Sequence, residues 1–407
     1  MMQQKVQSGP QEESFDVVVV GGGPAGATAA NDLARIGRSV LLLDRGGRIK
    51  PCGGAVPPIL LKEFDIPESL LVARSTCARM ISPGSVPVDM PINGFVGMVD
   101  REHFDPWLRE RAGQSGAVCR TGNFKTIEHD DDGRTVVVYQ PGGDAADAEP
   151  RRVTTRVVIG ADGARSEVAR QTIPEAHSIP FVAAYHEIVR SPPEGTFGFD
   201  GQRCDVYYQG ELSPDFYAWI FPHGDATSIG VGTANKGFSM RAAVTKLRER
   251  TGMAESETIR REGAPIPLRT LKCWDNRRDV VLAGDAAGGV APASGEGIYY
   301  AMFSGRLAAD AAEEFCRSGN PRALRSARKR FMKAHGRVFW ILGIMQRFWY
   351  KSDKRRERFV SICRDPDVQE LTWEAYMHKR LVKAKPLAHI RIFFKDMAHL
   401  LGFAPVK

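Results

Sequence analysis

Two groups of small and acidic residues, about 260 positions apart, have the spacing of a site that grips one long cofactor. The first group is Gly21-x-Gly23-Pro24-Ala25-Gly26; the second is Gly284-Asp285, followed by Pro292 and by Gly295-Glu296-Gly297-Ile298. In the first, one glycine permits a tight turn, the next lets backbone approach a pyrophosphate, and the third packs helix against strand. In the second, the Asp carboxylate can accept a hydrogen bond from a ribityl hydroxyl, and the following turn presents N–H groups. Together the two groups indicate a flavin dinucleotide.

The elements expected around the first group support this interpretation. The continuous, Val-rich run Phe15–Val20 predicts a buried parallel strand, and a helix is expected from about Pro24 to Ile36, closed by Gly37. Ser39–Leu43 is predicted as the next strand. It ends on Asp44, with Arg45 beside it, where the acid is placed to bind adenosine ribose hydroxyls. This β-α-β unit is the context in which the glycine pattern indicates a dinucleotide site.

Two further strands are expected to end at the cofactor. Val157–Ile159 reads as a buried strand and is followed by Asp162-Gly163, while the aliphatic run from Val280 runs into Gly284-Asp285. An Asp-Gly element followed by a Gly-Asp element resembles the para-hydroxybenzoate-hydroxylase-like FAD superfamily.

Three motifs make the resemblance narrower. Lys50-Pro51-Cys52-Gly53-Gly54-Ala55 resembles the Cys-Gly-Gly turn of geranylgeranyl reductases, and Gly97-Met98-Val99-Asp100-Arg101 resembles that family's strand and Arg. Tyr217-x-Trp219-x-Phe221-Pro222, with Gly230-x-Gly232, resembles its aromatic substrate motif. The resemblance covers about residues 15–310 and is closest to the (bacterio)chlorophyll-type enzymes, since Ala55 stands where the archaeal lipid-saturating branch typically has a third glycine.

The resemblance implies FAD, NADPH as electron source, and saturation of a geranylgeranyl chain, on a pigment ester or a free diphosphate, to a phytyl chain. It places Cys52, Gly53, Gly54 and Arg101 at the flavin. Tyr217, Trp219 and Phe221 are candidates for an apolar substrate groove. An isolated alkene needs a proton as well as a hydride. Cys52 could relay that proton or simply pack in its turn; Glu296 and His223 are weaker candidates.

The expected fold is α/β: a Rossmann-like FAD-binding domain with an inserted antiparallel sheet and a helical C-terminal region. We expect a disordered tail over residues 1–14, an FAD-binding domain over 15–176 and 271–310, and a substrate domain over 177–270. The basic helical region is expected over 311–407. Within the first domain, residues 46–100 read as loop-rich and 101–112 as a helix.

The C-terminal region carries most of the positive charge. Residues 321–407 hold 21 Lys and Arg against 7 Asp and Glu, within a chain whose formal charge is +8. Apolar stripes are predicted at Ala334, Val338, Ile341, Met345 and Phe348, and at Leu387, Ile390, Phe394, Met397 and Leu401. With the basic cluster Lys351, Lys354, Arg355, Arg356 and Arg358, the aromatics suggest peripheral contact with anionic lipid; an ordinary helical lid is the alternative.

Composition limits the other classes. The seven cysteines are scattered without a C-x-x-C, so neither a zinc site nor a disulfide framework is expected, and no metal is predicted. The longest strongly apolar stretch is too short to span a bilayer, and no signal-peptide core is seen, so a cytoplasmic protein is expected. A monooxygenase on the same fold remains the alternative enzyme. Nucleic-acid binding is not expected, because the aromatics of the tail form apolar stripes.

Overall fold

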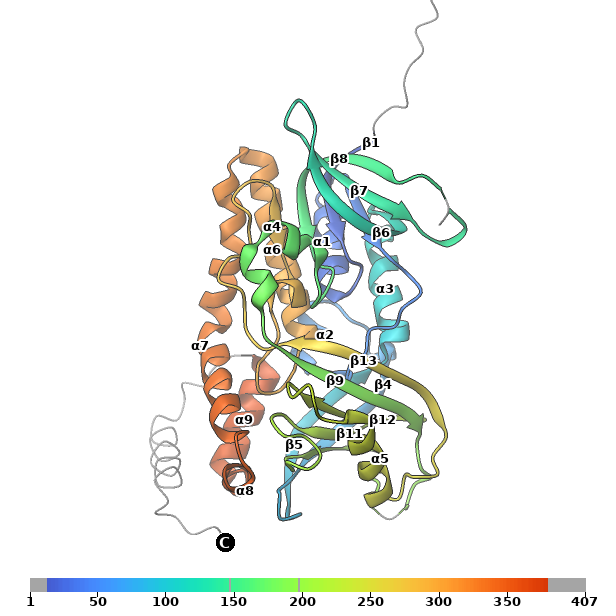
Figure 1. The fold of residues 1–407 in the computed structure, drawn as a ribbon, viewed down its shortest axis with the longest axis vertical. Helices are drawn as coiled ribbons and strands as arrows, with labels where there is room; N and C mark the ends of the chain where they lie inside the picture. Colours follow the sequence, from blue (N-terminus) through green and yellow to red (C-terminus); the bar gives the residue numbers. More distant parts are fainter. Residues whose placement is uncertain (1–12, 146–147, 197, 380–407) are drawn as a thin grey trace, which may run out of the picture.

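The computed structural model describes residues 13–145, 148–196 and 198–379, and it contains two sheets joined to a bundle of C-terminal helices (Figure 1). The second of the predicted C-terminal stripes, at residues 387–401, lies outside the described residues. No described helix combines the length and the apolar composition that crossing a bilayer requires.

The first sheet has six strands and a parallel centre. Its members are β1 (Glu13–Val20), β2 (Val40–Asp44), β6 (Val118–His129), β7 (Thr135–Pro141), β8 (Arg151–Gly160) and β14 (Val280–Leu282). β1 pairs in parallel with β2 and β8, β2 with β6, and β8 with β14, while β7 joins β6 and β8 antiparallel. Because β1, β2, β8 and β14 run the same way, the loops after Val20, Asp44, Gly160 and Leu282 gather at one edge.

Several helices pack against this sheet. They are α1 (Pro24–Arg35), α3 (Arg101–Gln114), the short α4 (Glu167–Thr172) and the long α6 (Ile298–Ser318). α1 starts with proline at its first turn and ends before Gly37, whose φ is +86°. The buried run Val17–Val20 packs in the same core as α1 and α6. The predicted α/β fold is confirmed.

The second sheet has eight strands in the order β13-β9-β12-β11-β10-β4-β5-β3. Five of its strands lie within residues 177–270, the segment predicted to form an antiparallel sheet: β9 (Phe181–Arg190), β10 (Arg203–Tyr207), β11 (Ala218–His223), β12 (Ala226–Thr233) and β13 (Thr258–Pro267), with α5 (Met240–Arg250) against them. All neighbouring pairs are antiparallel except β10 with β4.

The prediction that residues 46–100 are loop-rich was wrong. This segment forms β3 (Ala55–Val56), α2 (Pro58–Glu63), β4 (Leu71–Ile81) and β5 (Pro87–Val99), and the three strands belong to the second sheet. In β5, Val88, Met90 and Ile92 are buried and alternate with exposed polar residues or prolines. A strand with one wet face shows no continuous apolar run, so its signal is the alternation alone.

Two predicted boundaries also move. β1 begins at Glu13, inside the tail expected over residues 1–14, and α6 runs across the expected boundary at 310/311. The division into domains otherwise stays a prediction.

The C-terminal helices are α7 (Ser326–Trp349), α8 (Asp353–Ile362) and α9 (Pro366–His378). α7 buries the predicted stripe only in part: Ala334 and Ile341 are exposed, and Met345 and Phe348 are half-buried. The residues that face the core are Phe331, His335 and Phe339. α7 has apolar residues on two adjacent faces, so the periodicity of the sequence could not show which of the two is buried. The basic cluster is likewise not wholly on the surface, because Arg356 is buried and donates to Asp353, Pro214 and Tyr350.

Candidate functional site

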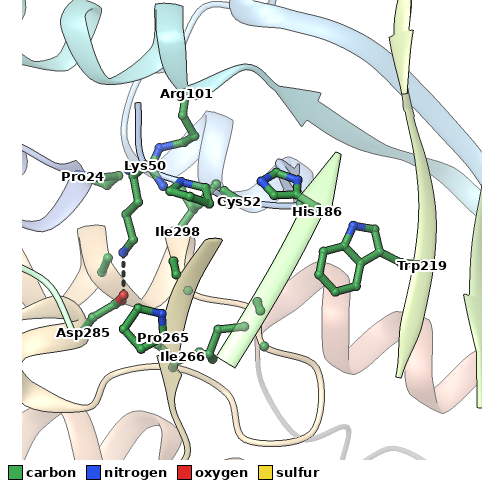
Figure 2. Close-up of a pocket in the computed structure, with 18 residues that line it drawn as sticks. Pro24, Lys50, Cys52, Arg101, His186, Trp219, Pro265, Ile266, Asp285 and Ile298 are labelled. Carbon is green, nitrogen blue, oxygen red and sulfur yellow. Dashed lines mark hydrogen bonds and ion pairs between the residues drawn. The ribbon is translucent and has the colours of Figure 1, made fainter. Parts of the chain in front are cut away.

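A cavity lies where the gathered loops of the first sheet face the second sheet (Figure 2). One side carries Pro24, Asp285, Gly295, Gly297 and Ile298 from the predicted cofactor groups, together with Lys50, Cys52, Gly53 and Arg101 from the reductase-like motifs. The second sheet contributes His186, Trp219, Pro265 and Ile266, together with Ala184 and Ala264. Pro24 and Asp285, which belong to the two motifs about 260 positions apart, thus line one cavity.

The three glycines at the start of α1 have different surroundings. A Cβ on Gly21 would lie 2.4 Å from the Ala161 carbonyl oxygen, and one on Gly26 would lie 1.9 Å from the Gly21 oxygen. Backbone atoms therefore leave no room for a side chain at either position. At Gly23 the nearest atom would be the Arg101 guanidinium, 3.9 Å away. Open space in front of a helix N-terminus and beside a cation is what a pyrophosphate requires, and it fits FAD.

Asp44 shapes the same turn. Its two carboxylate oxygens accept hydrogen bonds from the backbone N–H groups of Gly22 (2.7 Å) and Gly46 (2.9 Å). A second cavity, shared with Arg109, Arg120 and Thr121, opens beside it. Asp44 therefore lies where the adenosine end is expected, and a carboxylate with two bonds still has lone pairs for ribose hydroxyls. Arg45 is exposed and lines neither cavity, so its role stays a prediction.

Asp162 has another local task. Its carboxylate accepts hydrogen bonds from the Ser166 hydroxyl and from the N–H groups of Glu167 and Val168, so it caps the start of α4. Burial raises its pKa despite these bonds. Neither Asp162 nor Gly163 lines the two cavities, although the Ala161–Asp162 backbone packs against Gly21. The predicted contact of this element with the cofactor stays a prediction.

The Gly-Asp element sits at the floor of the cavity, in a short 3₁₀ turn over Gly284–Ala287. The Asp285 carboxylate is 2.5 Å from the Lys50 ammonium, which reaches across from the loop after β2 (Figure 2). Lys50 belongs to the Cys-Gly-Gly motif but was not among the predicted site residues. Asp285 can accept from a ribityl hydroxyl, and Lys50 places a cation beside it. Pro292 is buried but does not line the cavity.

Glu296 points away from the cavity that its neighbours Gly295 and Gly297 line. Its carboxylate pairs with the Lys379 ammonium at 2.5 Å, at the end of α9. Glu296 therefore does not provide a side chain to the cofactor or a proton to the cavity in this arrangement.

The Cys-Gly-Gly turn closes the cavity beside Arg101. The Cys52 thiol accepts a weak hydrogen bond from the Gly54 N–H at 3.4 Å, and Arg101 is held by a two-fold ion pair with Asp105 at 2.6 Å. Although burial lowers the pKa of Arg101, the Asp105 carboxylate and, more weakly, the Cys52 thiol raise it overall. A permanent cation and a thiol thus share one wall.

His223 contacts the Cys-Gly-Gly turn. It is a poor proton donor. Its Nε2 is 3.1 Å from the Gly53 carbonyl oxygen. Burial lowers its pKa to about 4, so the imidazole is neutral near pH 7.

The three aromatic substrate candidates are brought together but do different things. Trp219 lines the cavity. Tyr217 donates its hydroxyl hydrogen to the Ser294 carbonyl oxygen at 2.5 Å, and the Phe221 ring packs against Gly53.

Sequence reasoning missed the polar residues that hold Trp219. Its indole N–H donates to the Ser228 hydroxyl at 3.1 Å, the same oxygen lies 2.9 Å from His186 Nδ1, and His186 Nε2 lies 3.0 Å from the Glu262 carboxylate. Although burial raises the pKa of Glu262, its bonds to His186 and Arg260 lower it overall. These residues lie on three different strands, so no short sequence motif contains them. The only signal in the sequence was the alternation that places each of them on one face of its strand.

Comparison with known proteins agrees with this geometry. Residues 16–66 match the family model described as FAD dependent oxidoreductase, and residues 93–189 match the FAD binding domain. A geranylgeranyl diphosphate reductase of Rhodobacter capsulatus is 57% identical over 96% of this chain and 98% of its own length. One from Synechocystis is 35% identical, covering 95% and 97%.

A solved structure of a geranylgeranyl bacteriochlorophyll reductase-like protein from Thermoplasma acidophilum has the same fold. Its TM-score is 0.80 at 21% identity, covering 96% of this chain and 99% of that one. Since the two reductases are similar over nearly their whole length, the chain belongs to the FAD-dependent geranylgeranyl reductase family.

Proposed function

We propose that this protein reduces double bonds of a geranylgeranyl chain, toward a phytyl chain, in bacteriochlorophyll or chlorophyll biosynthesis. The observation that carries the proposal is that Asp285, Cys52 and Trp219 line one cavity: a flavin grip, a thiol and an apolar wall. The names of the Rhodobacter capsulatus and Synechocystis relatives support the substrate class.

The chain's residues have two tasks in this reaction. Bound FAD, reduced with electrons from NADPH, would supply the hydride. Trp219 and Ile266 provide the apolar wall against which an alkene can lie and from which water is excluded. A proton must reach the neighbouring carbon, and we assign this step to Cys52, because its thiol lies in the same cavity while the Glu296 carboxylate points away.

An anaerobic assay tests the reaction. The FAD-loaded enzyme is mixed with NADPH and with either geranylgeranyl bacteriochlorophyll or geranylgeranyl diphosphate, and the products are read by mass. We expect a gain of hydrogen pairs on one of the two. Oxygen uptake coupled to a hydroxylated product would instead indicate the monooxygenase alternative.

The role of Cys52 has its own test. Cys52→Ser should retain FAD but lose at least about tenfold in turnover, because a hydroxyl is a weaker acid than a thiol. Cys273→Ser changes an exposed free cysteine and serves as control. Full turnover of Cys52→Ser at full FAD occupancy would remove the thiol from the mechanism.

We also propose that α7 touches the membrane surface. Trp340 is 69% exposed and Ile344 47% exposed, and the exposed Arg337 and Arg347 share their helix face by spacing. An exposed aromatic between two cations suits an anionic lipid surface. We expect binding to phosphatidylglycerol vesicles at low salt, weakened in Trp340→Ser/Ile344→Ser. Ile36→Ser, an exposed residue at the end of α1, is the control. Equal sedimentation of all three with these vesicles would contradict the proposal.

A further inference from the structure

The loop over residues 293–297, which faces the flavin side of the cavity, is held from behind by the C-terminal helices. Gly295 and Gly297 line the cavity, whereas the side chain of Glu296 between them runs the other way and meets Lys379. Only 8% of the Glu296 side chain and 2% of the Lys379 side chain are exposed. This is a buried ion pair directly behind a cofactor-facing loop.

The surroundings of the pair are aromatic. The Lys379 ammonium lies 3.8 Å from the ring centroid of Tyr376 and 5.7 and 5.8 Å from those of Tyr300 and Tyr299. Cation–π attraction of this kind is strongest where water is excluded. Burial raises the pKa of Glu296 and lowers that of Lys379, and each charge offsets the effect on the other.

The carboxylate depends on this single cation. Among the residues that the structure describes, Glu296 Oε1 is buried without a hydrogen-bond partner, and Oε2 is the atom bonded to Lys379. Removing one member of a buried pair leaves an uncompensated charge. With Lys379 removed, the carboxylate must take up a proton or turn toward water, and the second change would move the adjoining glycines.

Other bonds hold the same loop at its start. The Tyr350 hydroxyl, at the end of α7, donates to the Ala293 carbonyl oxygen at 3.0 Å, and Tyr217 of the second sheet donates to Ser294. Gly295 has a φ of +66°. Because glycine has no Cβ, its backbone can reach many other conformations, and these bonds help to hold the loop in one of them. Lys379 adopts the left-handed conformation, with φ +53°, as it turns into the pair.

We propose that Lys379 is a positioning residue for FAD: by pairing with Glu296 it holds the 293–297 loop in the shape that binds the flavin. The C-terminal helical region is thereby part of the cofactor site. The inference rests on FAD binding and not on the identity of the isoprenoid substrate, so it can fail or succeed independently of the proposed reaction.

The test compares FAD affinity in the full-length chain. Lys379→Met should raise the FAD dissociation constant at least about tenfold and change the visible circular dichroism of the bound flavin. Glu296→Gln should weaken binding in the same direction. In the double variant Glu296→Met/Lys379→Met, two apolar side chains replace the pair, so the loss should be smaller than the product of the single losses.

A matched control separates positioning from general stability. Arg248→Met breaks another buried pair, with Glu187 at 2.5 Å, between α5 and the second sheet. It should lower the melting temperature but leave FAD affinity and the flavin spectrum unchanged. If Lys379→Met binds FAD as tightly as the parent, or loses affinity only as Arg248→Met does, the proposal is overturned.

Discussion

At the scale of single residues, the site depends on where a side chain is absent as much as on where one is present. Gly21 and Gly26 are closed by backbone atoms, whereas Gly23 faces open space next to Arg101. Gly21 and Gly26 are therefore required for the fold, whereas Gly23 is required only for the ligand to bind.

This difference predicts distinct outcomes for two alanine variants. Gly23→Ala should fold normally and bind FAD about 10- to 100-fold more weakly, because the new methyl displaces a phosphate from charge-assisted hydrogen bonds worth about 1.5–3 kcal/mol. Gly26→Ala should lose stability even without FAD. Far-UV circular dichroism and FAD titration check both. An unchanged FAD affinity of Gly23→Ala would show that the pyrophosphate lies elsewhere.

At the scale of elements, the strands of the second sheet act as one wall through a shared hydrogen-bond chain. Trp219 on β11, Ser228 on β12, His186 on β9 and Glu262 on β13 face the same side. A Cβ on Gly230, opposite Trp219, would lie 2.2 Å from the indole, so the glycine lets the ring lie flat across β12.

The wall can be tested at its central hydroxyl. Ser228→Ala leaves the Trp219 N–H and His186 Nδ1 without their partner, which should cost about 1–3 kcal/mol of unfolding free energy. It should also raise KM for the isoprenoid more than it lowers kcat, because the change affects the wall and not the flavin grip. Urea unfolding and steady-state kinetics measure the two effects. Ser178→Ala, at an exposed hydroxyl, is the control, and parent-like values for Ser228→Ala would contradict the wall.

At the scale of the whole molecule, the C-terminal helices share aromatic interfaces with the second sheet and with α6. Trp349 and Tyr350 pack in one cluster with Trp219 of β11 and with Tyr208 and Tyr217, which flank β10 and β11. On the other side of α7, His335 is enclosed by the rings of Tyr299, Tyr300 and Phe331.

The burial of His335 predicts sensitivity to acid. Burial, with the Lys379 charge, lowers its pKa to about 4. The unfolded imidazole takes up a proton near pH 6.5, so stability is complete above that pH and is lost as the pH falls toward 4. Between pH 7 and 5 this one group should cost about 2 kcal/mol of unfolding free energy.

His335→Phe keeps the ring without the titrating nitrogens and should reduce this loss, whereas the change of exposed His103 to Gln should not. Urea unfolding at the two pH values measures the difference. An equal loss in all three proteins would place the acid sensitivity in other groups, such as His223.

The sequence alone was enough to identify the family and to predict where a flavin would be held. The turn at Gly21–Gly26, the acid at Asp44 and the Gly-Asp turn at 285 are local patterns, because backbone geometry and strand ends dictate residue types within a few positions. The Cys-Gly-Gly turn and the aromatic strand could likewise be recognised in the sequence as short motifs.

The surroundings of the predicted flavin site follow from tertiary packing. β4 and β5 belong to the second sheet. Their apolar residues alternate with polar ones, and such a segment is stable as a strand only when neighbouring elements bury its apolar face. Lys50, His186 and Lys379 met Asp285, Glu262 and Glu296 across 235, 76 and 83 positions. Such pairs follow from how chain segments pack, and ion pairs and hydrogen bonds between distant segments leave no periodic trace in the sequence. For that reason Glu296, predicted to face the cofactor, turned instead to the C-terminal helices.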